Sequence, residues 1–74
     1  MPYVNIKITR EGASTEQKRQ LIEGVTQLLN DVLGKNPRTT CVVIDEVDTD
    51  NWGIAGVPVT ELRKHPPSWL ESGD

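Results

Sequence analysis

Pro2, directly after Met1, is the residue whose chemistry depends most on how the chain is processed. Methionine before a small residue is normally removed, and the Pro2 nitrogen would then be a free secondary amine instead of an amide. An α-amino group has a pKa of about 7.7–8.0 in water, and apolar surroundings or nearby cations lower that pKa toward neutrality. Such a group is an efficient general base. Pro2 is therefore a candidate for proton transfer, although proline is also tolerated at the head of an ordinary strand.

Other residues with chemical potential offer less. Cys41 is the single cysteine, and no base is adjacent to it in sequence, so we expect a small buried hydrophobic side chain. Asp48 and Asp50 have the spacing that opens a calcium loop, but Val59 stands where such a loop needs glutamate. The sequence therefore predicts neither a nucleophilic cysteine nor a metal site.

Two predicted strands would position Pro2. Residues 3–8 alternate polar and apolar side chains, which is typical of a half-buried strand with Pro2 at its head. The run of β-prone residues within 39–47 predicts a second strand that is covered on both sides. The two strands should be parallel, because a long helix connects them.

The connecting helix is predicted over residues 14–33. Ser14 and Gln17 have the spacing of a capping box. Apolar residues then recur at helical intervals as far as Leu33. Gly34 is a typical residue to end the helix.

The remaining chain predicts small elements. The glycine-studded stretch 52–57 is typical of a tight turn and a short hairpin, with positive φ angles at Gly53 and Gly56. Residues 60–64 would add one helical turn, and residues 66–74 a loosely held tail. The expected fold is thus an α+β single domain over residues 1–74, with one βαβ unit and a short C-terminal hairpin.

Length and charge limit the possible functions. A chain of 74 residues without phenylalanine builds only a thin core, which favours assembly into an oligomer. The net charge of −3 and the scattered basic residues do not fit a nucleic-acid binder. No apolar run is long enough for a membrane span, and the N-terminus has no signal-peptide pattern, so we expect a cytoplasmic protein.

Four segments together resemble the 4-oxalocrotonate tautomerase family. They are Pro2 at the head of a strand, "STEQKRQLIEGV" at the start of the helix, "VVIDEV" in the second strand and "NWGIAG" after it. The resemblance covers about residues 2–65. It implies a homohexamer built as a trimer of dimers, without cofactor or metal. It also implies an isomerase in which Pro2 moves a proton within a small enol or dienol acid to give the keto form.

The resemblance assigns further residues and leaves two roles open. Trp52 and Ile54 match the apolar wall of the family's substrate pocket. The family also binds the anionic substrate with two arginines, and neither stands at the matching position here. The first position corresponds to Ala13 or Glu11, depending on the direction of alignment, and the second corresponds to Cys41. Arg10 and Arg38 are the nearest candidates for a substrate-binding role.

Two other functions remain open at this point. A hydratase or dehalogenase of unsaturated acids would use Pro2 as an acid and would need Asp45 or Glu46 to activate water. A non-enzymatic oligomeric module would keep the fold without the chemistry, and the two missing arginines favour it.

Overall fold

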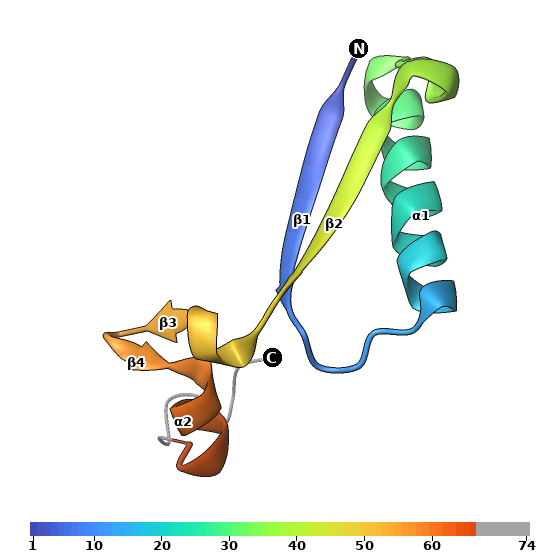
Figure 1. Ribbon diagram of the computed structural model, residues 1–74. Coiled ribbons are helices and arrows are strands. Elements are labelled where there is room, and N and C mark those ends of the chain that lie inside the picture. The colour runs from blue at the N-terminus through green and yellow to red at the C-terminus, as the bar shows by residue number, and fades with distance from the viewer. Residues whose placement is uncertain (67–74) are drawn as a thin grey trace.

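The computed structural model describes residues 1–66 (Figure 1). Its elements are, in chain order, β1 (Tyr3–Thr9), α1 (Thr15–Leu33), the 3-10 turn η1 (Pro37–Thr39), β2 (Cys41–Val47), the 3-10 turn η2 (Thr49–Asn51), β3 (Gly53–Ile54), β4 (Val57–Pro58) and α2 (Val59–Lys64). Strands β1 and β2 pair in parallel, and β3 pairs with β4 in antiparallel orientation. The predicted α+β class, with one βαβ unit and a short hairpin, is confirmed. The predicted tail over residues 66–74 lies outside the described residues, apart from Pro66.

Local sequence sets both ends of α1 as predicted. The Ser14 hydroxyl accepts a hydrogen bond from the Gln17 amide at 3.1 Å, and the Ser14 amide donates to Gln17 Oε1 at 2.9 Å. This capping box satisfies two backbone donors that the first helical turn leaves unpaired. At the other end, Gly34 adopts φ 67°, and its amide donates to the Asn30 carbonyl at 2.9 Å.

Strand β2 begins two residues later than predicted, at Cys41. The Asn36 side chain accepts a hydrogen bond from the Arg38 amide at 2.9 Å, and Pro37 favours a helical first position, so η1 forms instead of strand. The expected burial of Cys41 is also wrong, because this residue lies at the strand's end opposite the exposed Tyr3.

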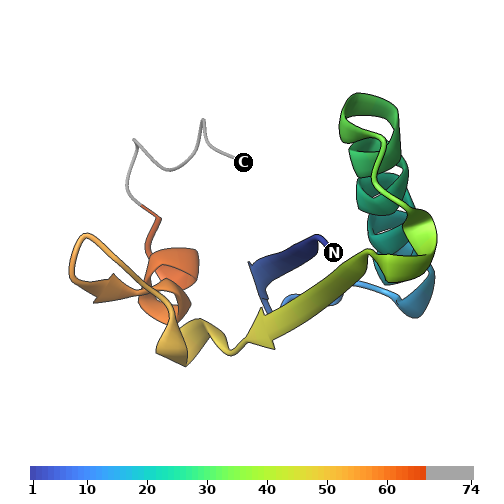
Figure 2. The ribbon, with the colours of Figure 1, turned by 90° about the horizontal axis from the view of Figure 1, so that it is seen from above.

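The hairpin turn departs from prediction at one position. Ala55 and Gly56 adopt positive φ angles of 54° and 81°, whereas Gly53 does not. Figures 1 and 2 show the hairpin and α2 beyond the end of the β1–β2 pair and away from α1. Within residues 1–66, only Val59 and Leu62 of α2 are buried apolar side chains.

Helix α1 leaves much of its apolar face uncovered in the single chain. Leu28, Val32 and Leu33 are 60%, 68% and 62% exposed. Such large apolar residues on one helix are expected to lie against another surface. No helix within residues 1–66 is long and apolar enough to cross a membrane.

Candidate active site

Pro2 lies at the end of the β1–β2 pair where both strands begin, and the N-terminus is marked there in Figure 1. Its carbonyl accepts a hydrogen bond from the Cys41 amide at 3.0 Å, so the first rung of the parallel ladder fixes the proline backbone. Pro2 is half-buried, whereas Met1 is 97% exposed. An exposed Met1 is accessible to an aminopeptidase, and its removal would leave a positioned amine on Pro2.

Arg38 lies at the same end of the sheet as Pro2. It belongs to η1, which leads directly into Cys41, the partner of Pro2. A 3-10 turn rises about 2.0 Å per residue, against about 3.3 Å for a strand. Arg38 is therefore nearer to the Cys41 position than an extended chain would place it. Its guanidinium forms no hydrogen bond or ion pair with residues 1–66, which leaves it available to an anion.

Trp52 and Ile54 lie at the opposite end of the sheet. They line a hollow of about 300 Å³. Its other walls are Lys7, Ile8, Thr9, Val59 and Arg63. Thr9 is seven residues from Pro2 along β1, which corresponds to roughly 23 Å of strand. One chain therefore does not bring Pro2 and the Trp52–Ile54 hollow together.

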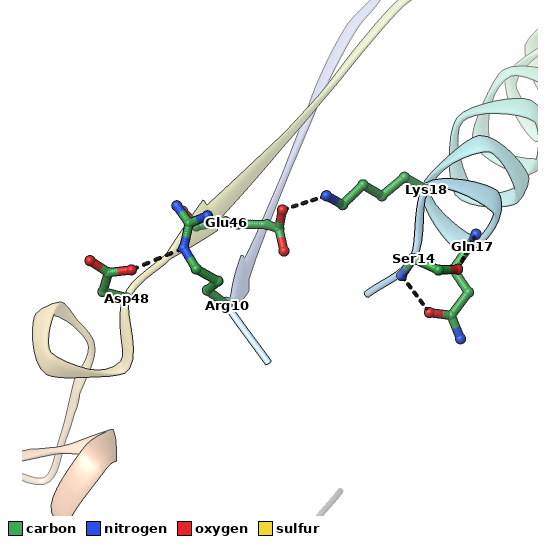
Figure 3. A network of polar contacts seen from close by, with 6 residues as sticks. All are labelled: Arg10, Ser14, Gln17, Lys18, Glu46 and Asp48. Carbon is green, nitrogen blue, oxygen red and sulfur yellow. Dashed lines mark hydrogen bonds and ion pairs between the residues drawn. The ribbon is translucent and has the colours of Figure 1, made fainter. Parts of the chain in front are cut away.

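Arg10 also lies at the hairpin end of the sheet, but other groups engage it (Figure 3). Its Nε donates to Asp48 Oδ1 at 2.9 Å, and its Nη2 donates to the Glu46 carbonyl at 3.3 Å. The Arg10 amide donates to the Val47 carbonyl at 2.8 Å. These contacts fasten the end of β1 to the end of β2, and Arg10 does not line the hollow.

Two cations line the hollow, Lys7 and Arg63, and neither is predicted from the sequence as a site residue. Lys7 Nζ donates to Asp45 Oδ2 at 3.0 Å. Arg63 lies four residues after Val59 and one residue after Leu62 in α2, and both of these side chains are buried. That spacing places Arg63 beside Val59 on the helix surface, and it is the one sequence signal that could have indicated this arginine.

Three carboxylates are held in their charged form by nearby donors. Hydrogen bonds from Arg63 and then Thr9 lower the pKa of Glu11. Hydrogen bonds from Asn5 and then Lys7 lower the pKa of Asp45. The hydrogen bond from Lys18 of α1 to Glu46 of β2 lowers the pKa of Glu46 (Figure 3).

These lowered pKa values predict the direction of acid denaturation. The unfolded chain binds more protons than the folded chain between the two sets of pKa values, so stability must rise with pH there. We expect full stability above the ordinary carboxyl pKa of about 4. Stability should be lost as the pH falls through the lowered folded values. Urea midpoints measured from pH 7 to pH 3, at one protein concentration, test this expectation.

A matched pair of variants isolates one of these ion pairs. Glu46→Gln should reduce the loss of stability between pH 5 and pH 3. In wild type, protonation of Glu46 breaks its ion pair with Lys18, and in the variant that ion pair is already absent. Glu23→Gln removes an exposed carboxylate that forms no ion pair with residues 1–66, and it should leave the acid limb as in wild type. Equal acid limbs in wild type and Glu46→Gln would contradict the assignment.

Comparison with known proteins identifies the family to which this chain belongs. The profile of a family described as tautomerase enzyme matches residues 2–62. The probable tautomerase K2 of Dickeya dadantii is 69% identical over 64 residues, which cover 86% of this chain and 96% of that protein. The 2-hydroxymuconate tautomerase of Comamonas testosteroni is 44% identical over 64 residues, which cover 86% of this chain and 100% of that protein.

Solved structures agree with the sequence relatives. The crystal structure of DmpI from Helicobacter pylori superposes with a TM-score of 0.81 at 49% identity, over 85% of this chain and 97% of that one. A heterohexameric 4-oxalocrotonate tautomerase from Chloroflexus aurantiacus superposes with a TM-score of 0.77 at 28% identity, over 85% of this chain and 100% of that one. The family profile and the full-length relatives agree, and the chain is a tautomerase, an isomerase of the 4-oxalocrotonate tautomerase family.

Proposed function

We propose that this tautomerase converts a small 2-hydroxydienoate or enolpyruvate-type acid into its keto form, with Pro2 as the general base after removal of Met1. The observation that carries the proposal is the position of Pro2. It is half-buried, backbone-fixed by Cys41, and the first residue of the mature chain once the exposed Met1 is gone. The similarity to a 2-hydroxymuconate tautomerase over nearly its whole length supports this substrate class.

The chemistry asked of Pro2 is a proton shift. The neutral amine takes the proton of the enol hydroxyl as the C–O bond becomes a carbonyl. The protonated amine then returns a proton to a carbon of the former double bond, at the near or the far end of the diene. No electrons are gained or lost overall, so we propose that the reaction needs no cofactor. Burial of the Pro2 amine by a second copy of the chain would favour its neutral form near pH 7.

Arg38 is the proposed partner of the substrate carboxylate at the Pro2 end. A guanidinium binds a carboxylate through paired, charge-assisted hydrogen bonds. Arg38 is exposed, lies at the Pro2 end of the sheet and forms no side-chain hydrogen bond or ion pair with residues 1–66. The proposed substrate is therefore an anion that places its carboxylate toward Arg38 and its enol toward Pro2.

The site is proposed to be complete only in an oligomer. Pro2 lies roughly 23 Å of strand from Thr9 and the hollow of Trp52 and Ile54, so a second copy must supply that wall. The exposed apolar residues of α1 supply a surface for such a copy. We propose a homohexamer arranged as a trimer of dimers, which is consistent with the hexameric relative.

The hydratase or dehalogenase function has less support. It requires a carboxylate that activates water, yet Lys7 and Asn5 engage Asp45, and Lys18 engages Glu46. Because these donors lower the pKa of both carboxylates, each is a weaker base than a free carboxylate.

One assay separates these functions. The mature protein should accelerate ketonisation of 2-hydroxymuconate or phenylenolpyruvate, followed by the loss of ultraviolet absorbance of the enol. It should release no chloride from 3-chloroacrylate at the same enzyme concentration. Chloride release without ketonisation would overturn the proposal in favour of the dehalogenase.

A further inference from the structure

Arg63 lies in the wall of the Trp52–Ile54 hollow, although it is outside the four sequence segments that carry the family resemblance. It extends from α2 on the surface next to the buried Val59, which lines the same hollow. A guanidinium beside an apolar hollow is a suitable group to fix the orientation of an anionic ligand.

The carboxylate of Glu11 holds Arg63 in place. Arg63 Nε donates to Glu11 Oε1 at 2.9 Å, and Arg63 Nη2 donates to Glu11 Oε2 at 3.1 Å. The Thr9 hydroxyl donates to the same Oε2 atom. This bidentate pair joins the loop after β1 to α2, 52 residues apart in sequence. It fixes the plane of the guanidinium as well as its position.

Glu11 is one of the two residues, with Ala13, that alignment places at the first substrate-binding arginine of the family. An acid there cannot bind a carboxylate, but it does bring an arginine of another element to the same loop. We infer that Arg63 binds a carboxylate of the substrate and that Glu11 is its positioning residue. This inference rests on the proposed function for the identity of the substrate, and it names the second cation of that site.

Neither of the other nearby cations fits the role as well. Arg10 does not line the hollow. Lys7 lines it, but its side chain is 62% exposed and its ammonium offers no planar fork. Arg63 pairs with Glu11 through Nε and Nη2, and the five N–H donors of a guanidinium allow it to contact more than one acidic group.

Equilibrium binding tests the inference without turnover. Titration calorimetry would use cis,cis-muconate, an unsaturated diacid that has no enol hydroxyl, and its monomethyl ester. We expect wild type to bind the diacid more tightly than the ester. Arg63→Gln should weaken diacid binding by about tenfold to a hundredfold, the range for a lost hydrogen bond to a charged group. The preference for the diacid should then disappear.

Further variants separate binding from folding. Arg63→Lys should recover part of the diacid preference, because the charge returns without the fork. Glu11→Gln keeps Arg63 but loosens it, and should weaken diacid binding several-fold. Arg19→Gln removes an exposed arginine of α1 and should bind as wild type does. If Arg63→Gln does not assemble, the Arg63→Lys and Glu11→Gln titrations decide the question.

Two results would overturn the inference: unchanged diacid preference in the Arg63 and Glu11 variants, or no diacid binding by wild type. Its failure is distinguishable from failure of the proposed function. Pro2-dependent turnover with unchanged binding in the Arg63 variants would refute the role of Arg63 alone. Arg63-dependent binding in a protein that turns over no enol would instead refute the proposed reaction and leave the anion site standing.

Discussion

Pro2→Ala is expected to lower kcat/KM for ketonisation by about 10²–10⁴-fold, the usual contribution of a positioned general acid or base. Alanine at the N-terminus still carries an amine, but a primary one that rotates freely. The Pro2 ring holds the nitrogen lone pair in one direction relative to a backbone that Cys41 fixes. Steady-state kinetics on 2-hydroxymuconate would measure the loss, and it should fall mainly on kcat.

A second form of the protein tests the same nitrogen without changing a side chain. An uncleaved N-terminal extension turns the Pro2 nitrogen into an amide, which cannot accept a proton at neutral pH. That form should be at least as inactive as Pro2→Ala, and mass spectrometry would confirm which chains begin at Pro2. Pro66→Ala removes an exposed proline elsewhere and should remain fully active. An extended chain as active as the mature one would refute the role of Pro2.

Leu28→Lys is expected to break the assembly and, with it, the activity. Leu28 is 60% exposed on α1, on the same helix surface as Leu21 and Val32. We expect a second copy of the chain to cover this surface, and a charge buried there without a partner is costly. Because the proposed site needs groups from two copies, activity should fall at least about tenfold, the equivalent of 1.4 kcal/mol.

The matched control for this variant is the adjacent residue. Gln27 is exposed about 100° around the helix from Leu28. Its amide donates to Asp31 Oδ1 at 2.8 Å, so Gln27→Lys adds the same charge with a carboxylate in reach. It should keep the wild-type mass and activity. Sedimentation velocity would report the mass of each variant. A Leu28→Lys protein with wild-type mass would show that the assembly uses a different surface.

Some of this protein follows from local sequence. The capping box of Ser14 and Gln17, the apolar periodicity of α1 and the glycine at its end are interactions between residues at most five apart. The alternation of residues 3–8 likewise determines which side chains of β1 face the helix. These elements could be predicted because neighbours in sequence are also neighbours in space.

The structure differs locally from the sequence prediction at the start of β2 and in the hairpin turn. Thr39 joins a 3-10 turn instead of β2 because the Asn36 side chain captures the Arg38 amide. Ala55 takes a positive φ that Gly53 was expected to take. In each case several backbone arrangements suit the same residues, and hydrogen bonding of the surrounding chain selects one.

The composition of the site was decided by tertiary structure. The pairing of Arg63 with Glu11 crosses 52 residues and depends on where Val59 and Leu62 anchor α2. No periodicity in the sequence specifies that distance. Pro2 and Trp52 are separated because Pro2 precedes β1 and Trp52 follows β2, and these two parallel strands begin at one end of the sheet and finish at the other. Sequence thus identified the candidate base, and three-dimensional packing determined that Arg63 and the Trp52–Ile54 hollow lie at the other end of the sheet from it.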